Sequence, residues 1–308
     1  MSIQIGIHTG PQEIEFEELS RLWKRADDAR FHWISVWDHF YANPMETAKE
    51  PCFEGVAAMA ALAAMTQHVR VGCLVFCSLF RSPGLLAKAA VTVDHISNGR
   101  AELGMGAGWL KQEFEDFGYD FPSLGKRLDQ TEEAVQIVRS LLSGEPTSFS
   151  GDYYQVQNAL CTPKPKQDKL RIWIGGRGER RTPMLAAKHG DGFNIPYVSP
   201  EGFRERNDTV DRFCEEIGRD PAEIERTINV AFYMGADEAG AKRNRKLVPF
   251  GDDLRGMGVL TGTAPEVVDR IGEYADKGAA GLNLAFRPPI DWDAFESFIS
   301  DVLPHFHK

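Results

Sequence analysis

Short apolar runs alternate with longer stretches of helical periodicity along the whole chain. The apolar runs predict eight strands, at residues 3–8, 33–37, 69–75, 101–106, 171–174, 192–195, 227–234 and 280–286. Apolar residues at helical spacing predict a helix after each strand, at residues 15–30, 54–66, 82–97, 126–143, 179–189, 200–217, 264–277 and 292–302. Eight strand–helix units on a chain of this length favour a closed (β/α)8 TIM barrel over an open doubly wound sheet.

Two segments interrupt this alternation. Residues 144–169 form an insertion between helix 4 and strand 5, in which residues 149–154 resemble a hairpin and residues 163–165 an extended surface segment. Residues 235–262 form a basic, irregular connection near the mouth of the barrel. Since no linker or shift in composition separates two parts, we expect residues 1–308 to form a single barrel domain.

The composition excludes several classes of function. A formal charge of −10 argues against a nucleic-acid or membrane-surface partner. The first residues lack a basic segment followed by an apolar core, and no apolar run is long enough to span a bilayer, so we expect a cytoplasmic protein. The five cysteines form no CxxC pair, which favours reduced thiols; they are Cys52, Cys73, Cys77, Cys161 and Cys214.

In barrels of this type the working residues follow the carboxyl ends of the strands. The predicted strands therefore supply a short group of candidates: His8, Asp38, His39, residues 74–77, 106–109 and 175–178, Asn194, Tyr233 and Arg287.

Asp38 and His39 directly follow the second predicted strand. A histidine in this position can exchange a proton near neutral pH, and a neighbouring carboxylate can orient or charge it. The alternative is a pair that only caps the loop. The same dipeptide at Asp94 and His95 lies inside a predicted helix, away from the mouth, so we expect a structural role there.

Two glycine clusters lie near strand ends. Residues 104–108 end the fourth strand, where missing side chains would allow a flat ring to approach the backbone, although the pattern lacks the acidic partner of a Rossmann fingerprint. Residues 175–178 lead from the fifth strand into a helix that carries Arg180 and Arg181 beside Arg177. Backbone N–H groups at a helix start and clustered arginines favour an anion-binding site over an ordinary turn.

Several other chemistries lack their motifs. The chain has no HExxH, and no HxH at its first strand end, so a metal-dependent hydrolase is disfavoured and we expect no metal site. It also has no Gly-x-Ser-x-Gly elbow. A mouth rich in glycine and aromatic residues with a single strand-end Asp-His pair favours a large planar cofactor that supplies its own reactivity.

Several sequence blocks resemble the luciferase-like monooxygenase superfamily, and most closely its branch that uses the deazaflavin coenzyme F420. They are Ser-Val-Trp-Asp-His-Phe at 35–40, residues 69–83, Ile-Ser-Asn-Gly-Arg at 96–100, Leu-Gly-Met-Gly-Ala-Gly-Trp at 103–109, Ile-Trp-Ile-Gly-Gly at 172–176, Arg-Thr-Pro at 181–183 and Asp-Gly-Phe-Asn at 191–194. The resemblance extends to about Asn194 and is weaker afterwards.

The resemblance implies an oxidoreductase that passes a hydride between F420 and a small organic substrate, with His39 as the proton-transfer residue beside Asp38. It also implies a bulge with a non-prolyl cis peptide near Leu74 and Val75 that supports the ring, and a homodimer. The implied cofactor contacts are Asp38, His39, Leu74, Val75, Cys77, Gly106, Ala107, Gly108, Trp109, Gly175, Gly176, Arg177 and Gly178, the last three holding the phosphate-bearing tail.

One position departs from the pattern. Sugar-phosphate dehydrogenases of the superfamily carry an acid directly after their Gly-x-Gly, where this chain has Trp109, which favours a more apolar reactant. Substrate choice is expected to depend on the loops at residues 41–52, 112–125 and 235–262. Two alternatives stay open: a monooxygenase that uses reduced FMN and O₂, and a non-catalytic cofactor carrier.

Overall fold

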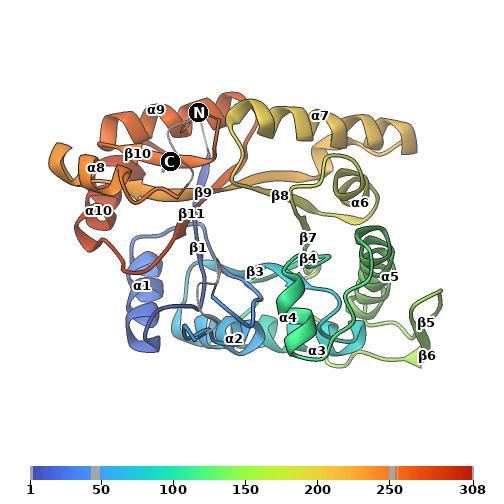
Figure 1. The fold of residues 1–308 in the computed structure, drawn as a ribbon. Helices are drawn as coiled ribbons and strands as arrows, with labels where there is room; N and C mark the ends of the chain where they lie inside the picture. Colours follow the sequence, from blue (N-terminus) through green and yellow to red (C-terminus); the bar gives the residue numbers. More distant parts are fainter. Residues whose placement is uncertain (1–2, 43–48, 250–253, 255, 307–308) are drawn as a thin grey trace.

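The computed structural model describes residues 3–42, 49–249, 254 and 256–306. Eight parallel strands close into a barrel, because β9 pairs with both β8 and β11, and β11 pairs with β1 (Figure 1). In order around the barrel they are β1 (Gln4–Thr9), β2 (Trp33–Val36), β3 (Arg70–Cys77), β4 (Ala101–Gly106), β7 (Ile172–Gly175), β8 (Gly192–Pro196), β9 (Glu225–Met234) and β11 (Gly281–Phe286). The predicted (β/α)8 TIM barrel is confirmed.

Helices that follow the strands surround the barrel (Figure 1). They are α1 (Phe16–Asp28), α2 (Gly55–Met65), α3 (Pro83–Ile96), α5 (Leu124–Leu142), α6 (Arg181–His189), α7 (Pro200–Ile217), α9 (Ala264–Asp276) and α10 (Trp292–Ser297). Each buries an apolar stripe against the strands; in α1 this stripe includes Leu19, Leu22 and Trp23. All eight correspond to predicted helices.

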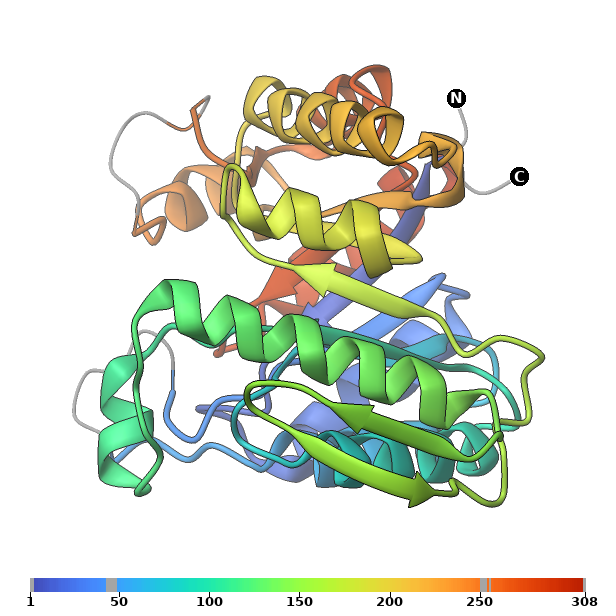
Figure 2. The same ribbon diagram turned by 90° about the vertical axis from the view of Figure 1, so that its right-hand side faces the viewer.

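The insertion between the fourth predicted helix and the fifth predicted strand is a hairpin, as expected. Its strands are β5 (Thr147–Ser150) and β6 (Gln155–Ala159), and Figure 2 shows it lying along α5. The Glu133 carboxylate on α5 accepts hydrogen bonds from the backbone N–H groups of Asp152, Tyr153 and Tyr154 at 2.8–3.1 Å. These bonds fix the turn to the helix.

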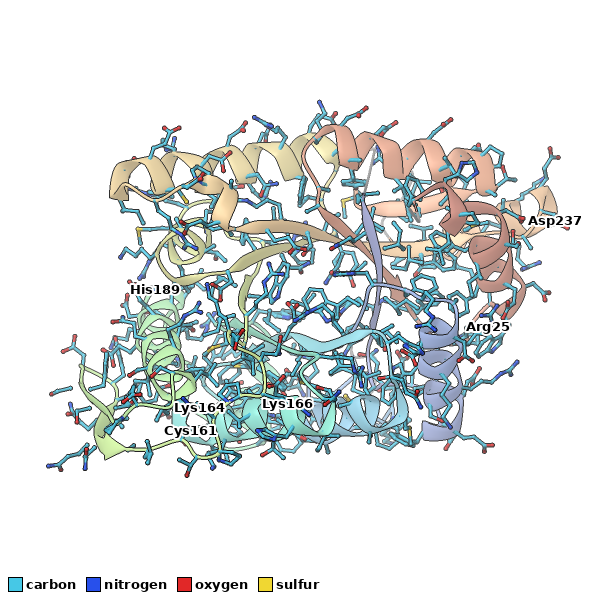
Figure 3. All side chains as sticks on the ribbon, turned by 180° about the vertical axis from the view of Figure 1, so that it is seen from behind. Arg25, Cys161, Lys164, Lys166, His189 and Asp237 are labelled. Atoms are coloured by element: carbon cyan, nitrogen blue, oxygen red, sulfur yellow. The ribbon has the colours of Figure 1, made fainter. Side chains whose placement is uncertain are left out.

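The segment after the hairpin is held against α3, far from the mouth. Asp94 is fully buried, and its carboxylate accepts the backbone N–H groups of Lys166 and Gln167. The ring of His95 bonds to the carbonyl oxygen of Lys164, and Figure 3 shows Lys164 and Lys166 beside this helix. The predicted structural role of this Asp-His pair is confirmed.

Two regions contain structure that the sequence pattern did not predict. Residues 235–262, expected to be irregular, contain α8 (Glu238–Arg245) and β10 (Val259–Gly262), which pairs with the carboxyl half of β9. The loop after β4 contains α4 (Lys111–Asp116). Helix α4 has six residues, too few for two full turns of apolar periodicity, and the eight residues of α8 include no large apolar side chain, so both lack the signal that identifies longer helices.

The barrel interior is filled by large side chains at its amino-terminal end. The rings of Trp33 and Trp173 lie 4.8 Å apart, and the indole N–H of Trp173 donates to Glu102. Arg70 pairs with the same carboxylate. These contacts fill the amino-terminal end of the barrel interior. No helix in the described part of the chain is long and apolar enough to cross a membrane.

Strand β3 carries the irregularity that the family resemblance implies. Its register against β4 shifts between Cys73 and Phe76, and the Leu74–Val75 peptide bond is cis without a proline. Both features fall at the predicted position.

Candidate active site

A cavity of about 1250 Å³ opens at the carboxyl ends of the strands. All thirteen residues predicted to contact the cofactor line it, and so do His8, Asn194, Tyr233 and Arg287. Of the candidate segment 74–77, Phe76 is buried in the hydrophobic core instead. Pockets for single drug-sized ligands measure roughly 300–1,000 Å³, so this cavity has room for a cofactor and a second reactant.

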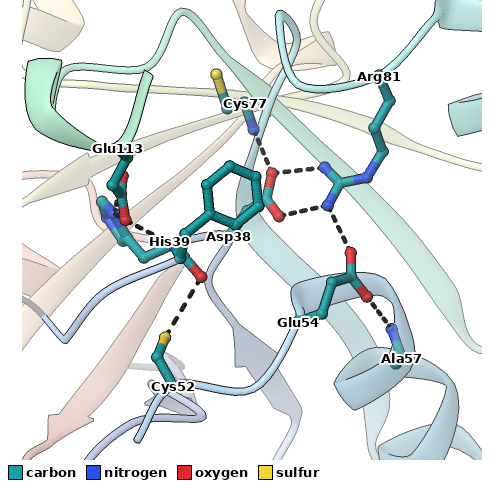
Figure 4. A network of polar contacts seen from close by, with 9 residues as sticks. Asp38, His39, Cys52, Glu54, Ala57, Cys77, Arg81 and Glu113 are labelled. Atoms are coloured by element: carbon teal, nitrogen blue, oxygen red, sulfur yellow. Dashed lines mark hydrogen bonds and ion pairs between the residues drawn. The ribbon is translucent and has the colours of Figure 1, made fainter. Parts of the chain in front are cut away.

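The carboxylate of Asp38 is held by Arg81 and not by its neighbour in sequence. Two nitrogens of the Arg81 guanidinium donate to the two Asp38 oxygens at 2.6 and 2.7 Å, and the backbone N–H of Cys77 donates to one of them at 2.9 Å (Figure 4). Arg81 also binds Glu54, the N-cap of α2. Burial alone would lower the pKa of Arg81, but its bonds to these carboxylates outweigh burial and raise it. Asp38 therefore joins the ends of β2 and β3.

The ring of His39 is bound by a carboxylate from a different element. Its Nδ1 lies 2.9 and 3.0 Å from the two oxygens of Glu113, which is carried by α4 and is 1% exposed (Figure 4). The edge of the His39 ring faces Trp109, with ring centroids 5.7 Å apart. The expectation that Asp38 orients His39 was wrong, because both Asp38 oxygens are engaged elsewhere.

Sequence reasoning missed Glu113 and Arg81. Glu113 follows Trp109 by four residues and is the third residue of α4, which returns its side chain to the mouth. This spacing was a usable signal, but only if the short helix had been anticipated. Arg81 stands just before the N-cap Ser82 of α3, where it resembles an ordinary surface arginine.

A second histidine lies deeper in the site. His8 is 4% exposed, its Nδ1 lies 2.9 Å from the hydroxyl oxygen of Ser35, and its ring lies 4.9 Å from that of Trp37. Burial, with the nearby charge of Arg287 as the second cause, lowers the pKa of His8 to about 3. His8 is thus a neutral hydrogen-bonding group at any physiological pH.

The floor of the cavity is the side chain of Val75, seated on glycines. A Cβ atom added to Gly106 or to Gly175 would lie 2.5 Å from a Val75 methyl group. We expected the missing side chains of residues 104–108 to leave the backbone open to a ring; at Gly106, Val75 fills the space instead. Behind Val75 lie the buried rings of Trp33 and Trp173. The result is a small apolar platform that fits the face of a planar ring.

The wall beside β7 carries the predicted anion-binding segment. Gly176, Arg177 and Gly178 line the cavity directly before α6, whose N-terminus has no side-chain cap. The N–H of Gly176 donates to a backbone carbonyl and Arg181 pairs with Asp129, so these two groups are already used inside the protein. The exposed Arg177 and the start of α6 are therefore the groups placed to meet an anion.

A sequence model described as luciferase-like monooxygenase matches residues 1–255. The chain belongs to this family. The match continues well past Asn194, where the recognisable motifs end. The remaining residues, which include β11 and α10, complete the barrel of this family member.

Two curated relatives match this luciferase-like protein over nearly its whole length. A 5,10-methylenetetrahydromethanopterin reductase from Archaeoglobus fulgidus is 27% identical over 304 residues, covering 98% of this chain and 84% of the relative. An F420-dependent glucose-6-phosphate dehydrogenase from Amycolatopsis mediterranei is 26% identical over 336 residues, covering 98% of both chains.

A solved structure supports the same fold for this luciferase-like protein. The F420-dependent secondary alcohol dehydrogenase, determined in complex with an F420-acetone adduct, superposes with a TM-score of 0.85 over the full length of both chains. Its sequence identity is 22%, so the likeness concerns the arrangement of the barrel and its helices.

Proposed function

We propose that this protein is an F420-dependent oxidoreductase that transfers a hydride between the deazaflavin coenzyme and a small organic substrate. The observation that carries the proposal is the pairing of an apolar floor, formed by Val75, with a carboxylate-bound histidine, His39, at one cavity. Relatives named as F420-dependent enzymes, one of them matched over 98% of both chains, support the choice of coenzyme.

The residues present fit such a coenzyme. F420, when bound, supplies a ring carbon that accepts or donates a hydride. Val75 would support one face of the ring, and Cys77 and residues 106–108 would surround its edge. Burial raises the pKa of the Cys77 thiol to about 12, so this cysteine would be a neutral, apolar neighbour. Arg177 and the start of α6 would bind the phosphate-bearing tail, and Gly176 and Gly178 would line the wall beside it.

His39 would exchange the proton that accompanies the hydride. Acid–base help of this kind is worth about 10²–10⁴-fold in rate. Asp38 would act in the same site as a positioning residue, since its bonds to Arg81 and to the Cys77 N–H fix the strand end from which His39 projects. We expect His39→Ala to leave the affinity for F420 largely intact while cutting turnover.

The second candidate is a monooxygenase that uses reduced FMN and O₂, which is the activity for which the family is named. Val75 would support the ring of FMN in the same way, and Arg177 would bind its phosphate. Separate titrations with F420 and with FMN, followed by protein fluorescence, distinguish the two. We expect F420 to bind the more tightly; tight binding of FMN alone would overturn the proposal. Binding of F420 without oxidation of the reduced coenzyme by any substrate would favour a carrier.

The reactant is expected to be more apolar than a sugar phosphate. Trp109 stands at the mouth beside His39, and it is 58% exposed, so its ring is available to a substrate. A screen of alcohols, ketones and enones against sugar phosphates, with reduced and oxidised F420, tests this choice. Turnover of sugar phosphates alone would contradict it.

We also propose that the protein acts in the cytoplasm as a homodimer. The described cysteines are all unpaired, which suits a reducing compartment. Helix α3 exposes Leu85 and Ile96, two large apolar side chains of the kind that subunit contacts cover. Light scattering after gel filtration measures the assembly directly, and a monomer at micromolar concentration would contradict the proposal.

A further inference from the structure

We infer that Glu113 is a positioning residue that holds the Nδ1 proton of His39 and so assigns Nε2 as the atom that exchanges a proton with the substrate. The inference deepens the proposed function and rests on it for its chemical meaning. The geometry on which it stands involves only residues of this chain.

The Glu113 side chain is surrounded by hydrogen-bond donors. Its Oε1 accepts the backbone N–H of Phe40 at 2.7 Å and that of Tyr41 at 3.1 Å, and both carboxylate oxygens lie within 3.0 Å of His39 Nδ1. Backbone N–H groups only donate, so the arrangement suits an ionised carboxylate, which only accepts. Because Glu113 accepts, His39 Nδ1 must carry the proton.

This bond decides which ring atom of His39 is the basic one. In a neutral imidazole one nitrogen carries the proton and the other carries the lone pair. With the proton held at Nδ1, the lone pair is at Nε2. When the ring is protonated, Glu113 also stabilises its positive charge. His39 can therefore take up and release a proton at Nε2 without turning its ring.

Helix α4 fastens Glu113 to the loop that carries His39. Its next residue, Phe114, is fully buried against Cys77 and Phe80. One turn later, Asp116 accepts a hydrogen bond from the hydroxyl of Tyr41 at 3.0 Å. The helix thus binds the loop after β2 at two points, of which only one touches the His39 ring. Asp116 therefore provides a matched control for Glu113.

Three other ionisable groups near His39 do not take the place of Glu113. Asp38, its neighbour, is neutralised by Arg81. His8, on β1, is kept neutral by burial. The Cys52 thiol donates to the carbonyl oxygen of His39 at 3.3 Å, and burial raises its pKa to about 12, so it stays protonated. Among the residues that the structure describes, Glu113 is the charged group that bonds to the ring.

The tautomer can be observed directly in the free protein. In ¹⁵N-histidine-labelled protein, the protonated and unprotonated ring nitrogens have well-separated shifts, and the His39 signals are assigned by their loss in His39→Asn. We expect the Nδ1–H tautomer in the wild type and in Asp116→Asn, and a mixture in Glu113→Gln. A wild-type ring that carries its proton on Nε2 would overturn the inference, whether or not any variant folds.

Kinetics provide the second measurement. We expect Glu113→Gln to lower kcat by about 10²–10⁴-fold, with little change in the Kd for F420, while Asp116→Asn stays near the wild type. The loss of kcat in Glu113→Gln should accompany the change of tautomer seen by NMR. A lowered kcat with an unchanged Nδ1–H tautomer would leave Glu113 a purely structural residue. If F420 does not bind, the proposed function is wrong, whereas the tautomer assignment, which is measured in the free protein, is unaffected.

Discussion

A methyl group of Val75 lies 2.5 Å from the position that a Cβ atom on Gly106 would take, which is too close for both atoms to be present. The two residues come from adjacent strands, β3 and β4, and the contact sits where β3 bulges. Gly175 on β7 meets the same side chain from the other flank. The glycines therefore make room for one valine, and that valine presents the floor of the cavity.

This contact predicts that Gly106→Ala is destabilising. The added methyl group must displace Val75 or shift β4, and overpacking of this kind costs about 1–3 kcal/mol. Denaturant unfolding monitored by circular dichroism measures the loss. Because Val75 moves into the cavity, the affinity for F420 should fall as well.

The matched control for that variant is Gly84→Ala on α3, where a Cβ would meet nothing within 4 Å. Its free energy of unfolding should be unchanged or slightly raised, because alanine favours a helix. Adding Val75→Ala to Gly106→Ala should recover part of the lost stability, since the two sites are in contact. If Gly106→Ala and Gly84→Ala have the same free energy of unfolding, Val75 and its neighbours can move aside at little cost, and the cavity floor is not rigid.

The Asp38–Arg81 pair predicts a large effect from removing one charge. Both side chains are nearly buried, at 1% and 10% exposure, so Asp38→Asn leaves the guanidinium without its main partner. Breaking a buried pair in this way costs about 3–5 kcal/mol. The neighbouring Glu54→Gln removes a carboxylate from the same arginine, but that carboxylate is 45% exposed, so we expect a loss of about 0–1 kcal/mol. Similar losses in the two variants, measured by urea unfolding at pH 7, would contradict this reasoning.

Much of the fold could be predicted because its signals are long and repeated. In strand β9, for example, large apolar residues alternate with other residues over several positions. Helix α7 shows apolar residues at helical spacing and begins with a proline. Helix α4 could not, because in its six residues only Glu113 and Phe114 are buried, and such a pair fits a loop equally well. Strand β10 is four residues long and gains its partner only when β9 is already in place.

The residues of the site were predictable to the extent that the barrel places strand ends together. Asp38 and His39 follow one strand, so their presence at the mouth could be expected from topology. Their partners could not, because Arg81 and Glu113 lie 43 and 74 residues further along the chain, and only the fold brings them close. Because Asp38 and His39 are adjacent in sequence, they were expected to interact with each other. In the structure each binds a different partner, Arg81 and Glu113 respectively.

The lowered pKa of His8 predicts how stability changes with pH. The unfolded chain binds a proton on this ring below about pH 6.5, whereas the folded protein does so only near pH 3, so unfolding takes up a proton between these values. Stability is full above pH 6.5 and falls as the pH drops toward 3, by up to about 1.4 kcal/mol per pH unit from this group. In His8→Asn the difference in stability between pH 7 and pH 5 should be smaller than in the wild type. A loss in His8→Asn identical to that of the wild type would contradict the assignment.

Trp109 and Phe114 lie close together in the chain but should respond to truncation in opposite ways. Trp109 is 58% exposed, so Trp109→Ala removes little buried area and should change the free energy of unfolding by no more than about 0.5 kcal/mol. Phe114 is fully buried, so Phe114→Ala should cost about 3–5 kcal/mol. A large exposed ring that contributes little to stability is available to a ligand. We therefore expect Trp109→Ala to raise the KM of the organic substrate while the rise in Tm on adding F420 stays close to that of the wild type. If Trp109→Ala instead unfolds as readily as Phe114→Ala, the ring is part of the core and cannot determine the choice of substrate.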